Sequence, residues 1–375
     1  MRVFTLSRLA SVALVIGVTA LGGCAADSDG DGSNRSEDEI QGGATDTNAA
    51  HSYAVGVRNL TGGVCSGTLI APNLVLTARH CVVPPSNATS VTCSDIFPAN
   101  VAASEMSITT EANLYKAKSS YGATEIITPT DKAFCGNDIA LIILARSVPA
   151  TEAQPAIPVV QFKLTDKRLS GNITAIGFGI TSPNVEDSGL RRVRENIPVL
   201  CIPGSSVIDC TGDRAKFTND AAEFVTQGYV CSGDSGSGAF DQRSYVRGQP
   251  YVLGALSRGP QTSDKCLAAI YSRTDVHAQL IIDAGMKAAT QGKYAPPTWT
   301  VPEAPGMASD PAPDPATSPN DPTAAPAAPK PSTMSTSGCS ASPMHSDASS
   351  SAFALAGLAL AGVLAARARV RRSRS

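Results

Sequence analysis

The sequence has no marked excess of charge of either sign. Its 375 residues carry 30 Lys and Arg against 32 Asp and Glu, which gives a formal net charge of −2. Nucleic-acid-binding proteins usually carry a basic excess, so no nucleic acid is expected among the partners. A glycine period and a heptad pattern are also lacking, which excludes collagen-like and coiled-coil chains. The hydrophobic fraction of 42% excludes a chain that is disordered throughout.

Cysteine and proline, in contrast, are abundant. The chain has ten Cys and 26 Pro, which indicates an oxidising compartment and at least one proline-rich segment. Eight of the cysteines lie between residues 65 and 266, and this even number indicates four disulfides, for which 105 pairings are open. None of the spacings has the CxxC form of a zinc site, so neither a metal nor a cofactor is expected.

The N-terminal segment, residues 1–24, has the pattern of a secretory signal. A basic start is followed by a mostly apolar run from Leu9 to Leu21. Leu21-Gly22-Gly23-Cys24 resembles a bacterial lipobox, which implies lipidation of Cys24; an ordinary signal with a chance Cys is the alternative. Residues 25–39 are rich in Asp, Glu, Ser and Gly, so they are predicted to be an acidic pro-segment or tether.

The C-terminal part divides into two segments. Residues 291–337 are predicted to be a Pro-rich linker, with twelve prolines from Pro296 to Pro331. Residues 338–375 contain Gly338-Cys339-Ser340, the fifteen apolar residues 352–366 and a terminal Arg cluster. This layout resembles the C-terminal sorting signal of myxobacterial surface proteins, and a plain tail anchor is the alternative. Both ends therefore predict an exported bacterial protein that is held at the cell envelope or cell surface by an N-terminal lipid, a C-terminal anchor or both.

The globular part is predicted to span residues 40–290. Short apolar, β-branched runs alternate with Gly, Pro, Asn and Asp, which predicts an all-β barrel or sandwich. Strands are expected at residues 67–70, 74–77, 139–144, 173–178, 251–256 and 269–272. Residues 275–289 have apolar side chains at helical spacing, so a helix with Asp275 as a possible cap is predicted to end the domain.

Three short segments carry residues suited to nucleophilic catalysis, namely Leu76–Cys81, Gly136–Leu141 and Cys231–Gly238. A serine hydroxyl is a poor nucleophile until a base takes its proton, and Ser235 lies between two glycines that let a substrate approach closely. His80 is the candidate base because imidazole titrates near neutral pH. Asp138 precedes an apolar run, where a carboxylate needs a partner such as the imidazolium.

The three segments, in the order His, Asp, Ser, resemble the chymotrypsin/trypsin-like serine proteases from Ile40 to Ala289. The resemblance implies two packed six-stranded antiparallel β-barrels with a C-terminal helix. It implies a serine endopeptidase that cleaves proteins or peptides through an acyl-enzyme, with His80, Asp138 and Ser235 as the triad. The N–H groups of Gly233 and Ser235 would form the oxyanion hole. The sequence departs from the family at Arg79, where Ala is usual, and at Arg258, where an aromatic residue is usual.

The resemblance also implies disulfide pairs and a substrate pocket. The implied pairs are Cys65–Cys81, Cys231–Cys266, Cys201–Cys210 and Cys93–Cys135. The implied pocket residues are Tyr229, Ser257, Gly259 and Ala269. Tyr229 stands at the pocket floor, where a tryptic enzyme has Asp, so the residue before the cut bond is predicted to be neutral and small or medium apolar.

Ile40-Gln41-Gly42-Gly43 resembles the first residues of mature enzymes in this family, which implies a zymogen. The freed amino group of Ile40 would pair with Asp234; an ordinary turn that enters the first strand is the alternative. Two other functions stay open at this point. One is a catalytically silent, protease-like binding or adhesion module, and the other is an esterase that uses the same mechanism.

Overall fold

The computed structural model describes residues 43–60, 63–84, 91–212, 220–263 and 265–301. The predicted signal with Cys24, the pro-segment, Ile40 and the C-terminal sorting segment lie outside these residues. Within the described ranges, no helix has both the length and the apolar character needed to cross a membrane.

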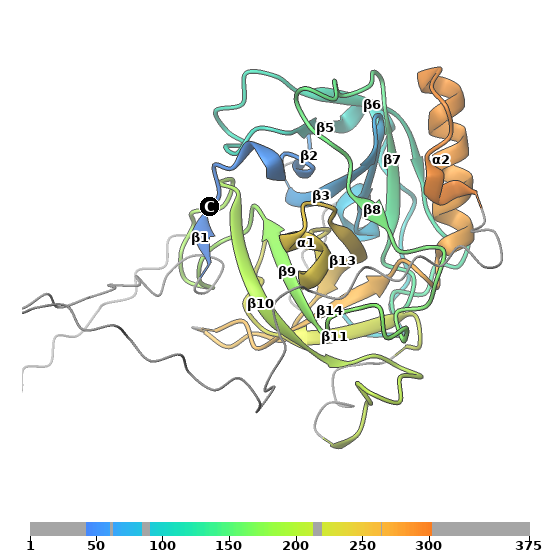
Figure 1. The fold of residues 1–375 in the computed structure, drawn as a ribbon. Helices are drawn as coiled ribbons and strands as arrows, with labels where there is room; N and C mark the ends of the chain where they lie inside the picture. The colour runs from blue at the N-terminus through green and yellow to red at the C-terminus, as the bar shows by residue number, and fades with distance from the viewer. Residues whose placement is uncertain (1–42, 61–62, 85–90, 213–219, 264, 302–375) are drawn as a thin grey trace, which may run out of the picture. The chain divides into compact units, whose positions relative to one another are not determined.

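The first half of the described chain forms a closed antiparallel barrel in the order β2-β3-β4-β7-β6-β5 (Figure 1). Its strands are β2 (Ala54–Asn59), β3 (Val64–Ala71), β4 (Leu74–Thr77), β5 (Met106–Thr109), β6 (Tyr121–Ile127) and β7 (Ala140–Leu144). Pairing of β2 with β5 closes the ring. All five residues of β7 are buried, because the strand is covered on both of its faces.

The second half forms another six-stranded ring. Its strands are β9 (Asn172–Gly177), β10 (Arg192–Cys201), β11 (Glu223–Gln227), β12 (Gly238–Asp241), β13 (Tyr251–Arg258) and β14 (Ala268–Arg273). The order β10-β11-β14-β13-β12-β9 is closed by pairing of β10 with β9. Two short strands join this sheet: β1 (Ala44–Thr45) pairs with β10, and β8 (Ile157–Pro158) pairs with β13. The prediction of two six-stranded antiparallel barrels is therefore confirmed.

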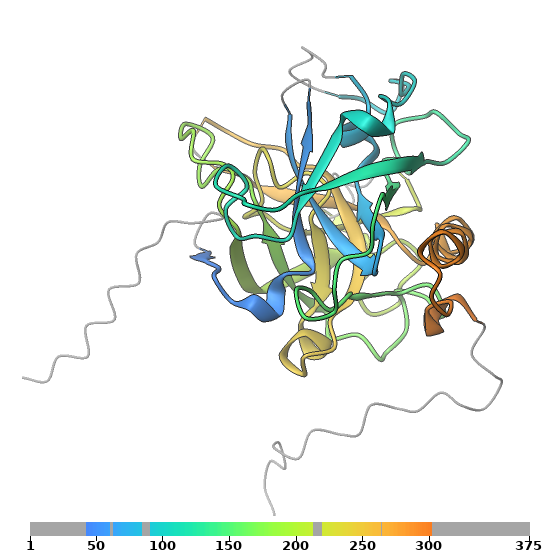
Figure 2. The ribbon, with the colours of Figure 1, turned by 90° about the horizontal axis from the view of Figure 1, so that it is seen from above.

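The C-terminal helix α2 (Ala278–Gly292) lies beside the first barrel (Figure 2). It packs there through a stripe of small and branched side chains. Ile281, Ala284 and Ala288 are buried in the same hydrophobic core as β3, β4 and β7. Residues 293–301, which include the 3₁₀ turn η5 (Thr298–Thr300), continue past the predicted boundary at residue 290. Trp299 is buried there, and its indole Nε1 donates to the carbonyl of Ile70 at 3.3 Å.

The prediction that Asp275 caps α2 is wrong, since the N-cap residue is His277. Both Asp275 carboxylate oxygens are bound elsewhere: Oδ1 accepts from Arg273 Nε at 2.9 Å, and Oδ2 accepts from Arg273 Nη2 at 2.8 Å. Oδ2 also accepts from the backbone N–H of Leu164 at 3.0 Å. Since this buried carboxylate pairs with a guanidinium, it stabilises the end of β14 and not the start of the helix.

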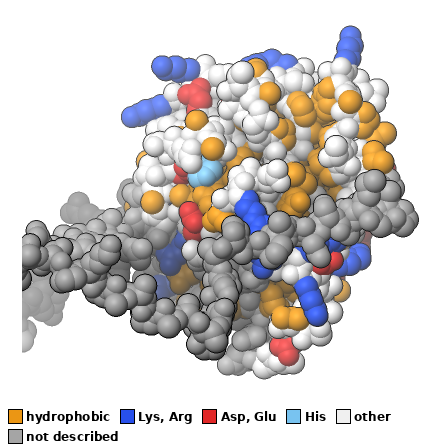
Figure 3. All heavy atoms as spheres, viewed as in Figure 1, with side chains coloured by type: hydrophobic (Ala, Val, Ile, Leu, Met, Phe, Trp, Pro, Cys, Tyr) orange, Lys and Arg blue, Asp and Glu red, His pale blue; other side chains and the backbone are white. Residues whose placement is uncertain are grey.

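On the face seen in Figure 3, acidic and basic side chains are scattered and form no large patch of one sign. Hydrophobic side chains gather toward the upper right of this view, on the side where Figure 1 draws α2. A short helix, α1 (Gln242–Val246), follows β12. Asp241 is its N-cap residue, and the carboxylate of Asp241 accepts the N–H of Ser244.

Candidate active site

His80 and Asp138 are in direct contact, and each lies on a segment next to a strand of the first barrel. His80 is in the 3₁₀ turn η2 (Arg79–Val82) after β4, and Asp138 lies two residues before β7. The imidazole Nδ1 lies 2.8 Å from Asp138 Oδ2, and the backbone N–H of His80 donates to Asp138 Oδ1 at 2.9 Å. One carboxylate therefore holds both the ring and the backbone of His80. The pairing of β4 with β7 brings the two residues together.

The surroundings of this pair favour its charged form. Asp138 is fully buried, and burial alone would raise the pKa of its carboxyl. His80 and the hydroxyl of Ser257, which donates to Asp138 Oδ2 at 2.6 Å, outweigh burial and hold the pKa of Asp138 below its usual range. Burial likewise opposes charge on His80, but Asp138 outweighs it and raises the pKa of His80. Since the His80 side chain is 28% exposed, it remains open to the surface.

Ser235 lies on the loop that connects β11 with β12. Its backbone carbonyl accepts from the N–H of Ser66 at 2.7 Å and lies 3.6 Å from Cys81 Sγ. Cys81 follows His80 directly, so the loop of Ser235 lies against the turn that carries His80. Gly233, two residues before Ser235, has a φ of 94°, which favours glycine. Its carbonyl accepts from Ser66 Oγ at 3.0 Å. The three predicted triad residues thus lie on adjoining segments where the two barrels meet.

Asp234 is fully buried next to Ser235. In the described part of the chain, its carboxylate is bound by two backbone N–H groups: Gly179 donates to Oδ1 at 2.8 Å and Cys231 donates to Oδ2 at 2.9 Å. Burial raises the pKa of Asp234 to about 6, against the lowering effect of these bonds and of Arg192. A buried carboxylate without a cationic partner is costly at neutral pH.

The described residues form the four expected disulfides, Cys65–Cys81, Cys93–Cys135, Cys201–Cys210 and Cys231–Cys266. The first of them joins β3 to the turn that carries His80 and lies beside the imidazole. Its two sulfur atoms are bonded to each other, so they are not free to act as thiolate ligands. The disulfide thus anchors the turn of His80.

The predicted pocket residues lie on β13, on β14, and on the segments that follow β11 and β13. Ser257 and Ala269 are buried, and a Cβ on Gly259 would meet the carbonyl of Ala268 at 2.0 Å. Tyr229 has a φ of 121°, which is unusual for a residue with a side chain. The guanidinium carbon of Arg194 lies 3.5 Å from the centre of its ring, and its hydroxyl accepts from Gln227 Nε2 at 2.9 Å. The residue preference derived from Tyr229 stays a prediction.

The two departures from the family pattern are both held by neighbouring groups. Arg79 is 4% exposed; its guanidinium carbon lies 4.8 Å from the ring centre of Phe97, and Nη1 donates to the carbonyl of Asp131. Arg258 pairs with Glu223, which sequence reasoning missed. The one sequence signal for Glu223 is an acidic residue at the head of the apolar run Phe224-Val225.

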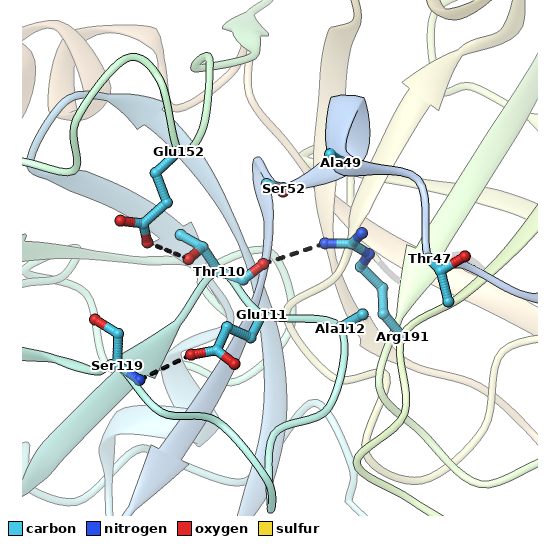
Figure 4. Close-up of a pocket in the computed structure, with 9 residues that line it drawn as sticks. All are labelled: Thr47, Ala49, Ser52, Thr110, Glu111, Ala112, Ser119, Glu152 and Arg191. Atoms are coloured by element: carbon cyan, nitrogen blue, oxygen red, sulfur yellow. Dashed lines mark hydrogen bonds between the residues drawn. The ribbon is translucent and has the colours of Figure 1, made fainter.

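The structure also contains a pocket of about 470 Å³ (Figure 4). It is lined by Thr47, Ala49, Ser52, Thr110, Glu111, Ala112, Ser119, Glu152 and Arg191. Its charged groups have partners: Arg191 Nη1 donates to the carbonyl of Thr110 at 3.2 Å, the N–H of Ser119 donates to Glu111 at 2.8 Å, and the hydroxyl of Thr110 donates to Glu152. None of the residues expected to act in catalysis lines this pocket.

Two closed six-stranded barrels, with a His–Asp pair beside a glycine-flanked serine at their junction, define a serine protease fold. In a comparison with known families, the trypsin family model matches residues 40–281. This match spans more than half of the chain, which therefore belongs to the trypsin family. The chain is also similar to phenoloxidase-activating factor 3 of Holotrichia diomphalia, with 28% identity over 229 residues. That match covers 58% of this chain and 62% of the relative, less than two thirds of its length.

Proposed function

We propose that this protein is an exported serine endopeptidase, made as a zymogen and anchored at the cell envelope, that hydrolyses peptide bonds of proteins or peptides. The observation that carries the proposal is the arrangement of His80, Asp138 and Ser257 beside the loop of Ser235. In the proposed mechanism, Ser235 attacks the carbonyl carbon and His80 takes its proton. Asp138 stabilises the resulting imidazolium, and the N–H groups of Gly233 and Ser235 bind the oxyanion.

An active-site fluorophosphonate tests this proposal directly, because it reacts with a serine that a neighbouring base has activated. We expect one covalent label per molecule of the processed protein, located at Ser235 by peptide mapping. Prior denaturation of the same protein should abolish the label. A folded, processed protein that takes up no label would contradict the peptidase and favour a binding or adhesion module.

The zymogen part of the proposal is supported by the surroundings of Asp234. Gly177 and Gly179 lie so close to its carboxylate that a Cβ on either would come within 2.6 Å of it. The carbonyl of Gly179 accepts from Arg192 Nη1 at 2.8 Å, and in the sheet Arg192 lies opposite Thr45 of β1. β1 therefore pairs with the strand whose Arg192 binds Gly179 beside Asp234. In the proposed active form, the amino group of Ile40 would supply a cation for the Asp234 carboxylate.

The anchoring part of the proposal rests on the two ends of the sequence. We expect Cys24→Ala to release the protein from the membrane fraction if the lipid is the anchor, and a chain that ends at residue 337 to be released if the C-terminal segment is. Immunoblotting of the soluble and membrane fractions distinguishes these outcomes. If neither single variant nor the double variant leaves the membrane fraction, anchoring by these segments is contradicted.

The residue preference follows from the absence of a carboxylate at Tyr229. A Lys or Arg side chain would enter the pocket without a partner at its floor, which costs several kcal/mol. We therefore expect peptides with Ala, Val or Leu before the cut bond to have kcat/KM values at least about 100-fold above those with Arg or Lys. A peptide-library profile measures this ratio, and a profile dominated by Arg or Lys would refute it.

A further inference from the structure

Arg258 and Glu223 form an ion pair next to Ser257, which binds Asp138 of the predicted triad. Arg258 ends β13 and Glu223 begins β11. Arg258 Nη1 lies 2.6 Å from Glu223 Oε1, and Nη2 lies 2.9 Å from Oε2, so the guanidinium binds both carboxylate oxygens. The Glu223 side chain is fully buried, and Oε1 also accepts the N–H of Gly136 at 2.9 Å. This pair therefore joins β11 and β13 to the loop that carries Asp138.

A directed chain of hydrogen bonds leads from the ion pair to His80. Arg258 Nη1 donates to Ser257 Oγ at 3.2 Å, and Ser257 Oγ donates to Asp138 Oδ2 at 2.6 Å. A guanidinium has no acceptor, so the hydroxyl of Ser257 must accept from Arg258 and point its own proton at the carboxylate. Asp138 Oδ2 in turn lies 2.8 Å from His80 Nδ1. Arg258 is thus two hydrogen bonds away from the carboxylate that holds the imidazole.

We propose that Arg258 and Glu223 are positioning residues for Asp138 and His80. Arg258 orients the Ser257 hydroxyl, and Glu223 cancels the charge of Arg258. The proposal rests on the peptidase function proposed above. An uncancelled guanidinium near Asp138 would offset the negative charge that stabilises the imidazolium. Conversely, an uncancelled Glu223 carboxylate would add to that negative charge. The balance of the two charges therefore sets the pH at which His80 loses its proton.

Other charged groups also face this region. They are Arg79 beside His80, Asp131, whose carbonyl accepts from Arg79, Asp220, whose carboxylate lies against Gly136, and His277, whose Nε2 lies 2.7 Å from the carbonyl of Gly136. Burial lowers the pKa of His277, so this imidazole is neutral at neutral pH and above. The described residues connect Asp138 by side-chain hydrogen bonds to His80 on one side and, through Ser257, to Arg258 on the other.

The experiment measures the acid limb of the kcat/KM profile of the active protein for Glu223→Gln, Arg258→Gln and the double variant. For Glu223→Gln we expect the midpoint to fall by about half a pH unit or more, because the Arg258 charge is no longer cancelled. For Arg258→Gln we expect the midpoint to rise, because the negative charge of Glu223 is no longer cancelled. The double variant should return close to the wild-type midpoint. Two single variants with opposite shifts are not expected from a pair that acts only as a brace.

Two further variants keep the test decisive. Arg258→Lys retains the charge and loses the two-pronged contact, so we expect an unchanged midpoint with a lower kcat even if the glutamine variants fold poorly. Lys287→Gln removes the same charge from an exposed pair with Glu125 and should leave the midpoint unmoved. Midpoints that stay at the wild-type value in Glu223→Gln and Arg258→Gln, or that move with Arg258→Lys, would overturn the proposal. A wild-type protein that neither cleaves peptides nor takes a label at Ser235 would instead contradict the peptidase function.

Discussion

Replacing Ser235 with alanine is expected to lower kcat by about 10⁶-fold while leaving the fold intact, because the acyl-enzyme can no longer form. His80→Ala should cost nearly as much, since members of a triad act as a unit. For Asp138→Asn we expect a loss on the order of 10⁴, because the amide NH₂ would favour the wrong imidazole tautomer. Steady-state peptide hydrolysis measures all three losses.

The buried position of Asp138 makes its variant the most informative of the three. Its two oxygens accept from the backbone and ring of His80 and from Ser257. A matched control is Asp283→Asn on the exposed face of α2, where Asp283 accepts from Gln279 at 2.8 Å, and this change should leave kcat at the wild-type value. Near-full activity of Asp138→Asn would show that the triad assignment is wrong.

Cleavage after Glu39 is the second change with a large expected effect. We expect it to raise kcat by about 10³-fold or more, because the loop of Asp234 carries Gly233 and Ser235, and a misplaced oxyanion hole alone costs 10²–10³. Glu39→Arg allows trypsin to make this cut at will. N-terminal sequencing should then find Ile40 in the active form. Full activity in a chain still joined to the residues before Ile40 would contradict the zymogen.

Asp234→Asn provides the control, since in the Glu39→Arg background it should be cut normally and stay inactive. A second measurement follows from the pKa of Asp234, which burial raises to about 6 in the uncut chain, above the ordinary value of 3.8. The folded chain therefore holds this proton more tightly than the unfolded chain. The destabilisation is absent below about pH 4, grows as the pH rises, and is complete above the folded pKa of about 6.

The unfolding free energy of uncut Ser235→Ala protein tests this directly. Between pH 4 and pH 8, we expect Asp234→Asn in that background to gain up to about 3 kcal/mol relative to its parent. The comparison between two pH values removes the pH-independent cost of the hydrogen bond that Asn cannot accept. A difference that does not change with pH would mean that Asp234 already has a cationic partner before cleavage.

Local features of the fold were predictable to within a few residues. The turn at Pro72-Asn73 separates two apolar runs, and β3 and β4 lie on either side of it. The strand expected at residues 173–178 is observed as Asn172–Gly177, because a short run of apolar and β-branched residues after a glycine is a local signal. Asp275 shows the limit of such reasoning. Its position before an apolar run is typical of a cap, but Arg273, which the fold holds beside it, binds the carboxylate.

The sequence by itself determined where the apolar runs and turns lie and that His80, Asp138 and Ser235 occur in an order and context typical of one protease family. The tertiary structure alone decided that Asp234 is buried against backbone N–H groups, and that Arg258 meets Glu223 at a separation of 35 residues. A local sequence pattern reflects burial and turn formation over only a few neighbouring positions. The Arg258–Glu223 contact depends instead on β14, which pairs with both β11 and β13 and brings their ends together beside Asp138.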